Sequence, residues 1–204
     1  MKKILTALIC VAIILSICIT GYAEPSDGND IHFDITPKEF ITRFNNDKDN
    51  PGTVSLIADD KYDECELVFE DNDSKSGIQV QFVNYTGSIE GMTTGAGLKN
   101  EKFNWIYAYI VTDEDSIDVD TLSMLTIIEF LFANALGLDF DLEKYMSEAV
   151  ISGTLFPTIT YVNDNVKYMI QFRDASVGNL YQTVYSASIM VGQAAQDIRY
   201  SNAS

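Results

Sequence analysis

The chain has 204 residues, of which 47% are hydrophobic and 21% are charged, a composition typical of a folded globular protein. It carries 30 acidic and 13 basic residues, for a net charge of −17. This charge argues against binding to nucleic acid or to anionic lipid, because both need a surface rich in Lys and Arg.

Residues 1–23 have the three parts of a secretory signal peptide. Two lysines follow the initiating Met, residues 4–20 form an uncharged and mostly apolar run, and Ala23 ends a small-residue cleavage site before Glu24. The short positive start is typical of bacterial signals. Because the apolar run is short for a membrane span, we expect cleavage, with an uncut anchor as the alternative. The expected product is secreted or extracytoplasmic and does not insert into the membrane after cleavage.

Cleavage would leave Cys65 as the single cysteine, so the product could form no intramolecular disulfide. Its fold would depend on the apolar core, which a chain of this length can supply. Cys65 alternates with Leu67 and Phe69, a pattern that predicts a small buried side chain. The alternative is a free thiol for pairing with another molecule.

The exported part opens with residues 24–35, whose polar and turn-forming composition predicts a flexible leader. Signals for the start of a helix come next. Thr36 suits the N-cap, Pro37 suits the first helical position, and Glu39 stands where a capping box places an acidic residue. A short helix with one apolar side is therefore predicted, and residues 45–52 end it.

Alternation of apolar and polar residues then predicts four strands. They cover residues 54–58, 64–70, 78–82 and 103–111. The last two are separated by residues 84–102, a segment with four glycines and no clear periodicity. A loop of this length inside a compact domain is uncommon and often functional.

Residues 122–136 predict a long helix that is apolar almost all round and ends at Gly137. Such a helix is normally buried, and burial would raise the pKa of Glu129, its single charged side chain, which usually calls for a Lys, Arg or Tyr partner. A second, amphipathic helix follows at 141–150, and residues 192–204 have the composition of a frayed tail. Three more strands are predicted at residues 159–161, 166–173 and 181–189.

Two stretches of the chain repeat a pattern at an offset of 103 residues. Residues 67–71 align with residues 170–174, and the alternation stays in phase between 56–82 and 159–185. A duplicated unit of one helix and three strands would explain this similarity. The alternative is that two antiparallel hairpins share alternation and loop length without a common origin.

The sequence predicts an α+β fold in which an antiparallel β-sheet packs against helices. The domain is expected to span residues 36–191, with two tandem helix-plus-three-strand repeats, 36–111 and 120–191, as a hypothesis. The helix at 122–136 is the best candidate to cover the sheet.

Reactive side chains are few, apart from carboxylates. His32, the single histidine, lies in the predicted leader, where packing would not hold it against a nucleophile, and zinc needs more His and Cys ligands than remain. Calcium prefers six to eight oxygen ligands, which makes an acidic loop the candidate metal site. The alternative is a solvated acidic surface that keeps the protein soluble. The candidate calcium ligands are Asp113, Asp115, Asp118 and Asp120.

Aromatic residues repeat on one side of the strand at 103–111, beginning with Phe103. Such a row most often belongs to the core, but on an open sheet it suits a sugar or peptide ligand. Together with the glycine-rich loop beside it, the row predicts a ligand-binding site. The candidate ligand-binding residues are Trp105, Tyr107, Tyr109, Tyr85 and Met92.

The sequence shows no nucleophile–base set, no zinc set and no cofactor-binding loop. It favours a secreted, non-enzymatic binding or inhibitory module that recognises an extracellular protein, peptide or glycan without a cofactor. Two alternatives stay open. One is a secreted hydrolase that uses paired carboxylates, and the other is a calcium-stabilised envelope protein.

Overall fold

The structure is a computed structural model that describes the chain from residue 31 to residue 198, with gaps. The described residues are 31–47, 54–59, 65–69, 77–88, 92–94, 98, 101–112, 119–153, 157–174 and 182–198. Their helices are α2 (Pro37–Asn46), α3 (Val119–Leu136), α4 (Leu142–Glu148) and α5 (Gly192–Asp197). Their strands are β1 (Val54–Ala58), β2 (Cys65–Phe69), β3 (Ile78–Asn84), β4 (Thr93–Thr94), β5 (Trp105–Thr112), β6 (Val150–Ser152), β7 (Thr158–Asn163), β8 (Val166–Asp174) and β9 (Thr183–Val191).

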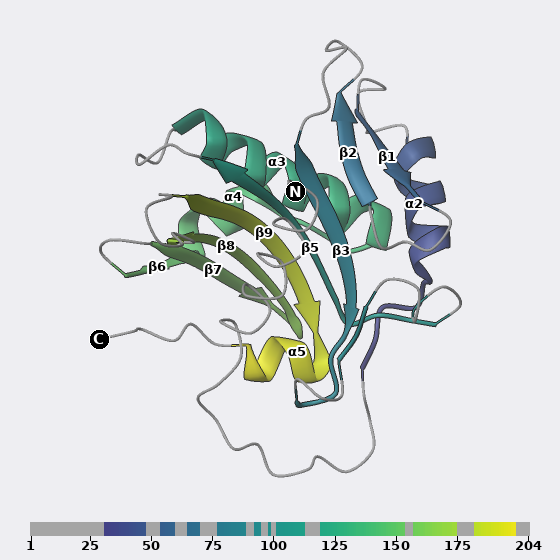
Figure 1. Cartoon of the computed structure of the whole chain (residues 1–204). Coiled ribbons are helices and arrows are strands. Elements are labelled where there is room, and N and C mark those ends of the chain that lie inside the picture. The colour runs from purple at the N-terminus through teal and green to yellow at the C-terminus, as the bar shows by residue number, and fades with distance from the viewer. Residues whose placement is uncertain are drawn as a thin grey trace.

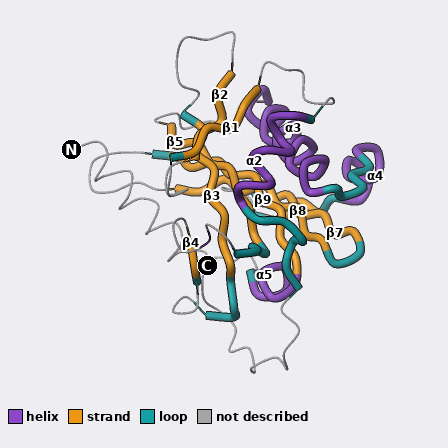
Figure 2. The backbone as a smooth tube through the Cα atoms, turned by 90° about the vertical axis from the view of Figure 1, so that its right-hand side faces the viewer, coloured by secondary structure: helices purple, strands orange, loops and turns teal. Residues whose placement is uncertain are grey.

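All nine strands join one antiparallel sheet in the order β1-β2-β3-β5-β9-β8-β7-β6, with β4 paired to the end of β3. Helices α3 and α4 lie along one side of the sheet, and α2 packs on the same side at the β1 edge (Figures 1 and 2). We call this side the helix-facing side. The predicted α+β fold, an antiparallel sheet packed against helices, is confirmed.

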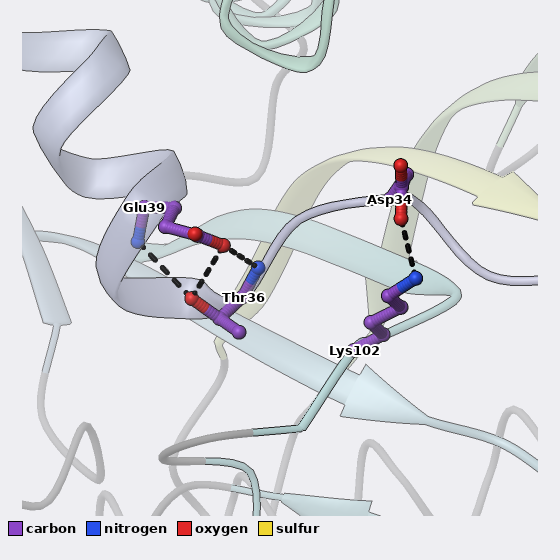
Figure 3. Close-up of polar contacts among 4 residues, drawn as sticks. All are labelled: Asp34, Thr36, Glu39 and Lys102. Carbon is purple, nitrogen blue, oxygen red and sulfur yellow. Dashed lines mark hydrogen bonds and ion pairs between the residues drawn. The ribbon is translucent and has the colours of Figure 1, made fainter.

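Helix α2 begins with the predicted capping box (Figure 3). The Glu39 N–H donates to Thr36 Oγ1 at 3.3 Å, and the Thr36 N–H donates to Glu39 Oε2 at 2.9 Å. These bonds satisfy main-chain groups that the first turn of a helix leaves without partners. Just before the helix, Lys102 and Asp34 form an exposed ion pair, which stabilises the fold little.

The ordered chain begins earlier than the sequence predicted. Phe33 and Ile35 lie in the expected leader, yet both are buried in the core. The Phe33 N–H donates to the Phe103 oxygen at 2.9 Å, and the two rings lie 5.3 Å apart. Two apolar side chains among polar neighbours are enough to hold this segment against the sheet, because their burial is favourable.

Helix α3 provides much of the core on the helix-facing side. Its Phe132 ring lies 5.4 Å from Phe40 and 5.7 Å from Phe44, which joins α3 to α2. Gly137 ends the helix with φ +74°, a conformation that favours glycine. The predicted burial holds for part of the helix, including Leu125, Ile128 and Phe132, but Ile127 is 57% exposed.

The two halves of the chain are related differently from the predicted offset of 103 residues. That offset aligns β2 with β8 and β3 with β9. In the sheet, the two strands of each pair run in the same direction, but β2 and β3 approach β5 from one side whereas β8 and β9 approach it from the other. No rotation that keeps the helix-facing side can therefore superpose the two pairs. A two-fold rotation between β5 and β9 instead matches β1, β2, β3 and β5 with β6, β7, β8 and β9. The strands of the two halves therefore do not correspond in the sheet at the offset of 103 residues, and the tandem repeats 36–111 and 120–191 stay a hypothesis.

Residues 192–197, which the sequence placed in a frayed tail, form helix α5 at one end of the sheet (Figure 1). Gly192 begins it with φ +58°, and a Cβ there would lie 2.5 Å from the Ile31 oxygen. Ala194 and Ile198 are buried against the sheet, which explains why the segment is ordered. Within the described part of the chain, no helix has both the length and the apolar character of a membrane span.

Candidate functional site

The predicted ligand-binding residues lie on the side of the sheet that faces away from α2, α3 and α4, which we call the outer face. Alternation along each strand sends every second side chain to this face. In the central strands these side chains include the aliphatic Val83, Val111 and Val184 as well as aromatic, amide, hydroxyl and thioether groups: Gln79, Gln81, Trp105, Tyr107, Tyr109, Met169, Gln171, Ser186, Ser188 and Met190.

Three aromatic rings form a row along β5. The Trp105 and Tyr107 rings lie 5.0 Å apart at 33°, and the Tyr107 and Tyr109 rings lie 5.8 Å apart at 35°. Phe103 was predicted to begin this row, but it precedes β5 and belongs to the core on the helix-facing side, 5.0 Å from Phe82. The row therefore consists of one indole and two phenol rings, all of which carry a hydrogen-bonding group.

Polar side chains flank the aromatic row. Tyr107 stands between Gln81 of β3 and Ser188 of β9, and its hydroxyl donates to Gln81 Oε1 at 2.5 Å. Among the described residues, the buried Nε1–H of Trp105 has no acceptor. An unpaired buried donor is destabilising, so an acceptor placed beside this N–H would be favourable.

Helix α5 covers the Trp105 end of the outer face. Lys167 of β8 is buried there and donates through Nζ to the main-chain oxygens of Ile198 at 2.5 Å and Ala195 at 3.4 Å. A positive group at the C-terminal end of a helix is favourable because the last carbonyl groups lack helical partners. The bonds from Lys167 thus fix α5 to the sheet.

The other two predicted residues join the same cluster, since Tyr85 is buried in it and Met92 packs against it. The sequence pattern did not point to Asn104, a fully buried amide that holds Tyr85 in place. Its Oδ1 accepts from the Tyr85 N–H at 2.8 Å, and its Nδ2 donates to the Tyr85 oxygen at 2.7 Å. The available signal was a single Asn between two aromatic residues.

The structure thus brings all five predicted ligand-binding residues together on one face. Trp105, Tyr107 and Tyr109 are 0%, 2% and 3% exposed. All three rings are therefore buried, as in a row that belongs to the core. Because the sequence predicts that export removes residues 1–23, the experiments below use the chain that begins at Glu24.

The predicted calcium ligands are only partly covered by the structure. Asp113, Asp115 and Asp118 lie outside the described residues, and Asp120 is exposed in the first turn of α3. Within the described ranges, no group of three or more His, Cys, Asp or Glu side chains could hold a metal ion. The calcium site stays a prediction.

The single histidine, His32, makes a side-chain hydrogen bond, and Cys65 is packed in the core. His32 Nε2 lies 2.9 Å from Asn84 Oδ1, which links the N-terminal segment to β3. Cys65 is a free and buried cysteine, as its alternation predicted, and burial raises the pKa of its thiol to about 12. A thiol held this far from ionisation is a poor nucleophile at neutral pH.

Glu129 on α3 is fully buried between this helix and the sheet. Burial raises the pKa of its carboxyl to about 8, as the sequence analysis anticipated. Tyr145 of α4 lies close enough to lower this pKa in part, and the main chains of Met169 and Ser188 act in the same direction. At hydrogen-bonding geometry, however, neither carboxyl oxygen nor the Tyr145 hydroxyl has a partner among the residues that the structure describes. Burial therefore favours the neutral form of the Glu129 carboxyl.

The chain matches no protein-family model, no curated protein and no solved structure.

Proposed function

We propose that the protein is a secreted binding or inhibitory module that recognises an extracellular protein, peptide or glycan through the outer face of its sheet. The observation that carries this proposal is the chemistry of that face. Trp105, Tyr107 and Tyr109 form a row of rings, and amide and hydroxyl side chains stand on both sides of it.

The contrast between the two sides of the sheet supports this proposal. The helix-facing side of β5 and β9 carries mainly apolar side chains, such as Ile106, Ala108 and Ile189, together with the ring of Tyr185. The outer face of the same strands carries the hydroxyl groups of Tyr107, Tyr109, Ser186 and Ser188, and amide side chains lie on the neighbouring strands β3 and β8. Burying such groups under an apolar cover is unfavourable unless each finds a hydrogen-bond partner. A ligand with polar groups and flat apolar surfaces, such as a peptide or a sugar, satisfies both requirements.

The hydrolase alternative needs two carboxyl groups facing each other across a cleft. Glu129 has the raised pKa expected of a general acid, but its carboxyl is buried on the helix-facing side, where a substrate would have to displace α3 or α4. The described geometry thus favours recognition over hydrolysis.

The test uses the single tryptophan as a reporter, because Trp105 lies in the proposed site. The chain beginning at Glu24 is screened against a peptide library and a glycan array, and each candidate is then titrated while Trp105 emission is recorded. Tyr107→Phe removes the hydroxyl that donates to Gln81 without adding volume. Ser147→Ala is the matched control, because it removes an exposed hydroxyl from α4 on the other side of the sheet.

We expect saturable binding that changes the emission of Trp105 and is about fivefold weaker in Tyr107→Phe, the size of one lost hydrogen bond. Ser147→Ala should bind like the unchanged chain. Failure of every peptide and glycan to bind would refute the proposal. Turnover of a chromogenic ester, glycoside or peptide that disappears when one acidic side chain is neutralised would support the hydrolase instead, and a rise in Tm with Ca²⁺ would support the calcium-stabilised protein.

A further inference from the structure

Helix α4 is held on the helix-facing side by a single buried side chain. Tyr145 is buried, whereas the other six residues of the helix are exposed. The Tyr145 ring lies 5.2 Å from Phe140 and 5.4 Å from Tyr161, and the Tyr168 ring completes the group, 5.0 Å from Phe140 and 5.8 Å from Tyr161. We call these four rings the α4 ring cluster. A helix of seven residues is marginal by itself, so α4 depends on this contact.

The carboxyl group of Glu129 on α3 lies beside the Tyr145 hydroxyl. The carboxyl is fully buried, and among the residues that the structure describes neither its oxygens nor the Tyr145 hydroxyl has a hydrogen-bond partner. Burial of an unpaired polar group is unfavourable, and burial of an unpaired charge is far more so. An ionised Glu129 therefore needs water, and α4 keeps water away while Tyr145 stays in the core.

The ionisable groups that face Glu129 come from α4 and β8. They are the hydroxyls of Tyr145 and Tyr168, and a charge on Glu129 would raise the pKa of both. Strand β9 contributes the main chain of Ser188, and β7 contributes Tyr161, on whose pKa Glu129 has no effect. Within the described ranges, no Lys or Arg side chain acts on the pKa of Glu129, so an ionised carboxylate would lack a counter-charge there.

Water can reach Glu129 only if one of the surrounding elements moves. Helix α3 holds Leu125 and Phe132 in the core, and β8 and β9 pair along their length, so displacing either would expose much apolar surface. Displacing α4 withdraws only Tyr145 from the core. Elements with few buried contacts open locally at the lowest free energy, which makes α4 the part that yields first.

We propose that α4 is a pH-sensitive cover, which detaches from the sheet as the pH rises and exposes the α4 ring cluster. Detachment lets water reach the Glu129 carboxyl, which then releases its proton to the solvent. Burial holds the pKa of this carboxyl at about 8 in the closed form, and hydration returns it toward 4.5 in the open form. The open form therefore gains about tenfold over the closed form for each pH unit between 4.5 and 8, and gains no more above pH 8.

Hydrogen exchange of the α4 amides, followed by NMR in the chain beginning at Glu24, measures this opening. The Tyr145 N–H donates to the Asp141 oxygen at 2.8 Å and the Ala149 N–H donates to the Tyr145 oxygen at 3.0 Å, so both amides exchange when α4 opens. Rates at pH 6, 7 and 8 are divided by those of an unstructured peptide, which removes the direct effect of hydroxide. We expect the corrected opening to rise about tenfold per pH unit. Urea should accelerate exchange much less in α4 than in β9, because local opening exposes little surface.

Three variants identify the group responsible. Glu129→Gln cannot release a proton, so its corrected opening should not change with pH. Glu148→Gln is the matched control, because it makes the same change at an exposed position of α4 and should keep the tenfold rise. Tyr145→Phe keeps the ring and removes the hydroxyl that lowers the pKa of Glu129 in part. The pKa of Glu129, measured from the carboxyl ¹³C shift, should therefore move upward in Tyr145→Phe, which a purely structural role of Tyr145 would not produce.

The proposal is overturned if the corrected opening at Tyr145 and Ala149 is the same at pH 6 and pH 8, or if Glu129→Gln keeps the pH dependence. Equal acceleration by urea in α4 and in β9 would also overturn it, since the α4 amides would then exchange through global unfolding. None of these measurements involves a ligand or the outer face, so this proposal and the proposed function can fail separately.

Discussion

At position 129 a carboxyl group lies inside the core, where the pattern of α3 would allow an aliphatic side chain. Desolvation favours its neutral form, which raises its pKa from 4.5 to about 8. Tyr145 and Tyr168 lie near enough for a Glu129 charge to raise their own pKa values. The core around Glu129 thus contains ionisable groups that are all neutral at pH 7.

This pKa makes the stability of the protein depend on pH. Between pH 4.5 and pH 8 the folded chain holds a proton on Glu129 that the unfolded chain has lost. The stabilisation from this proton is complete below pH 4.5 and disappears as the pH rises through 8. We expect the free energy of unfolding to fall by about 3 kcal/mol between pH 5 and pH 8 from this residue. Urea unfolding at a series of pH values measures this fall.

Glu129→Gln should remove that fall, because an amide does not titrate. Glu148→Gln is the matched control, since the same change is made at an exposed position on α4. It should leave the difference between pH 5 and pH 8 unchanged. Equal pH dependence in Glu129→Gln and the unchanged chain would show that the carboxyl is not held neutral by the core.

Cys65 gives a second prediction at the scale of one residue. Its thiol is buried, and the rise of its pKa from 9.0 to about 12 lowers the thiolate fraction by a factor on the order of 10³. In the chain beginning at Glu24, a chromogenic thiol reagent should therefore react slowly with the folded protein and rapidly in urea. Rapid labelling without denaturant would contradict the burial.

At the scale of the element, α3 decides how the helices cover the sheet. Its burial is uneven, because Leu125 is fully buried whereas Ile127, two residues later, is 57% exposed. A helix that is apolar all round carries no sequence signal for which side faces the solvent. Packing on β8 and β9 and contact with Phe40 and Phe44 of α2 set that orientation.

The same substitution at the two positions should therefore have opposite outcomes. Leu125→Lys removes a buried apolar side chain and introduces a charge into the core, which should lower the free energy of unfolding by about 4 kcal/mol or more. Ile127→Lys should change it by less than about 1 kcal/mol, as expected at an exposed position. Thermal unfolding followed by circular dichroism measures both, and equal loss of stability would contradict the observed orientation of α3.

At the scale of the whole molecule, one sheet unites the two halves of the chain. Residues 105–112 of β5 pair along their length with 183–190 of β9, and the core on the helix-facing side draws on both halves. Phe132 of the second half packs against α2 of the first. Neither half would bury its apolar surface without the other.

We therefore predict one cooperative unfolding transition. Trp105 lies on β5, next to β9 in the middle of the sheet, so its fluorescence reports on the junction of the halves. Far-ultraviolet circular dichroism reports on all helices and strands. The two signals should coincide throughout urea unfolding, as expected for a two-state domain. Two separate transitions would show that the halves fold independently.

Much of the local structure was readable from the residues. The capping box of Thr36 and Glu39, the end of α3 at Gly137 and the inward position of Cys65 depend on neighbours a few residues away, so the sequence was enough to predict them. That Trp105, Tyr107 and Tyr109 share one face was also predictable, because alternation along one strand determines which side chains lie together, whereas ligand binding by these residues stays a prediction.

Long-range pairing was decided only in the folded molecule. Strand β5 lies between β3 and β9, which places its aromatic row in the middle of the outer face, and no local pattern specifies strand order. Phe33 and residues 192–197 were assigned to loose ends because their neighbours in the chain are polar. They are ordered because apolar partners meet them from distant segments, and the free energy of burial depends on those spatial neighbours.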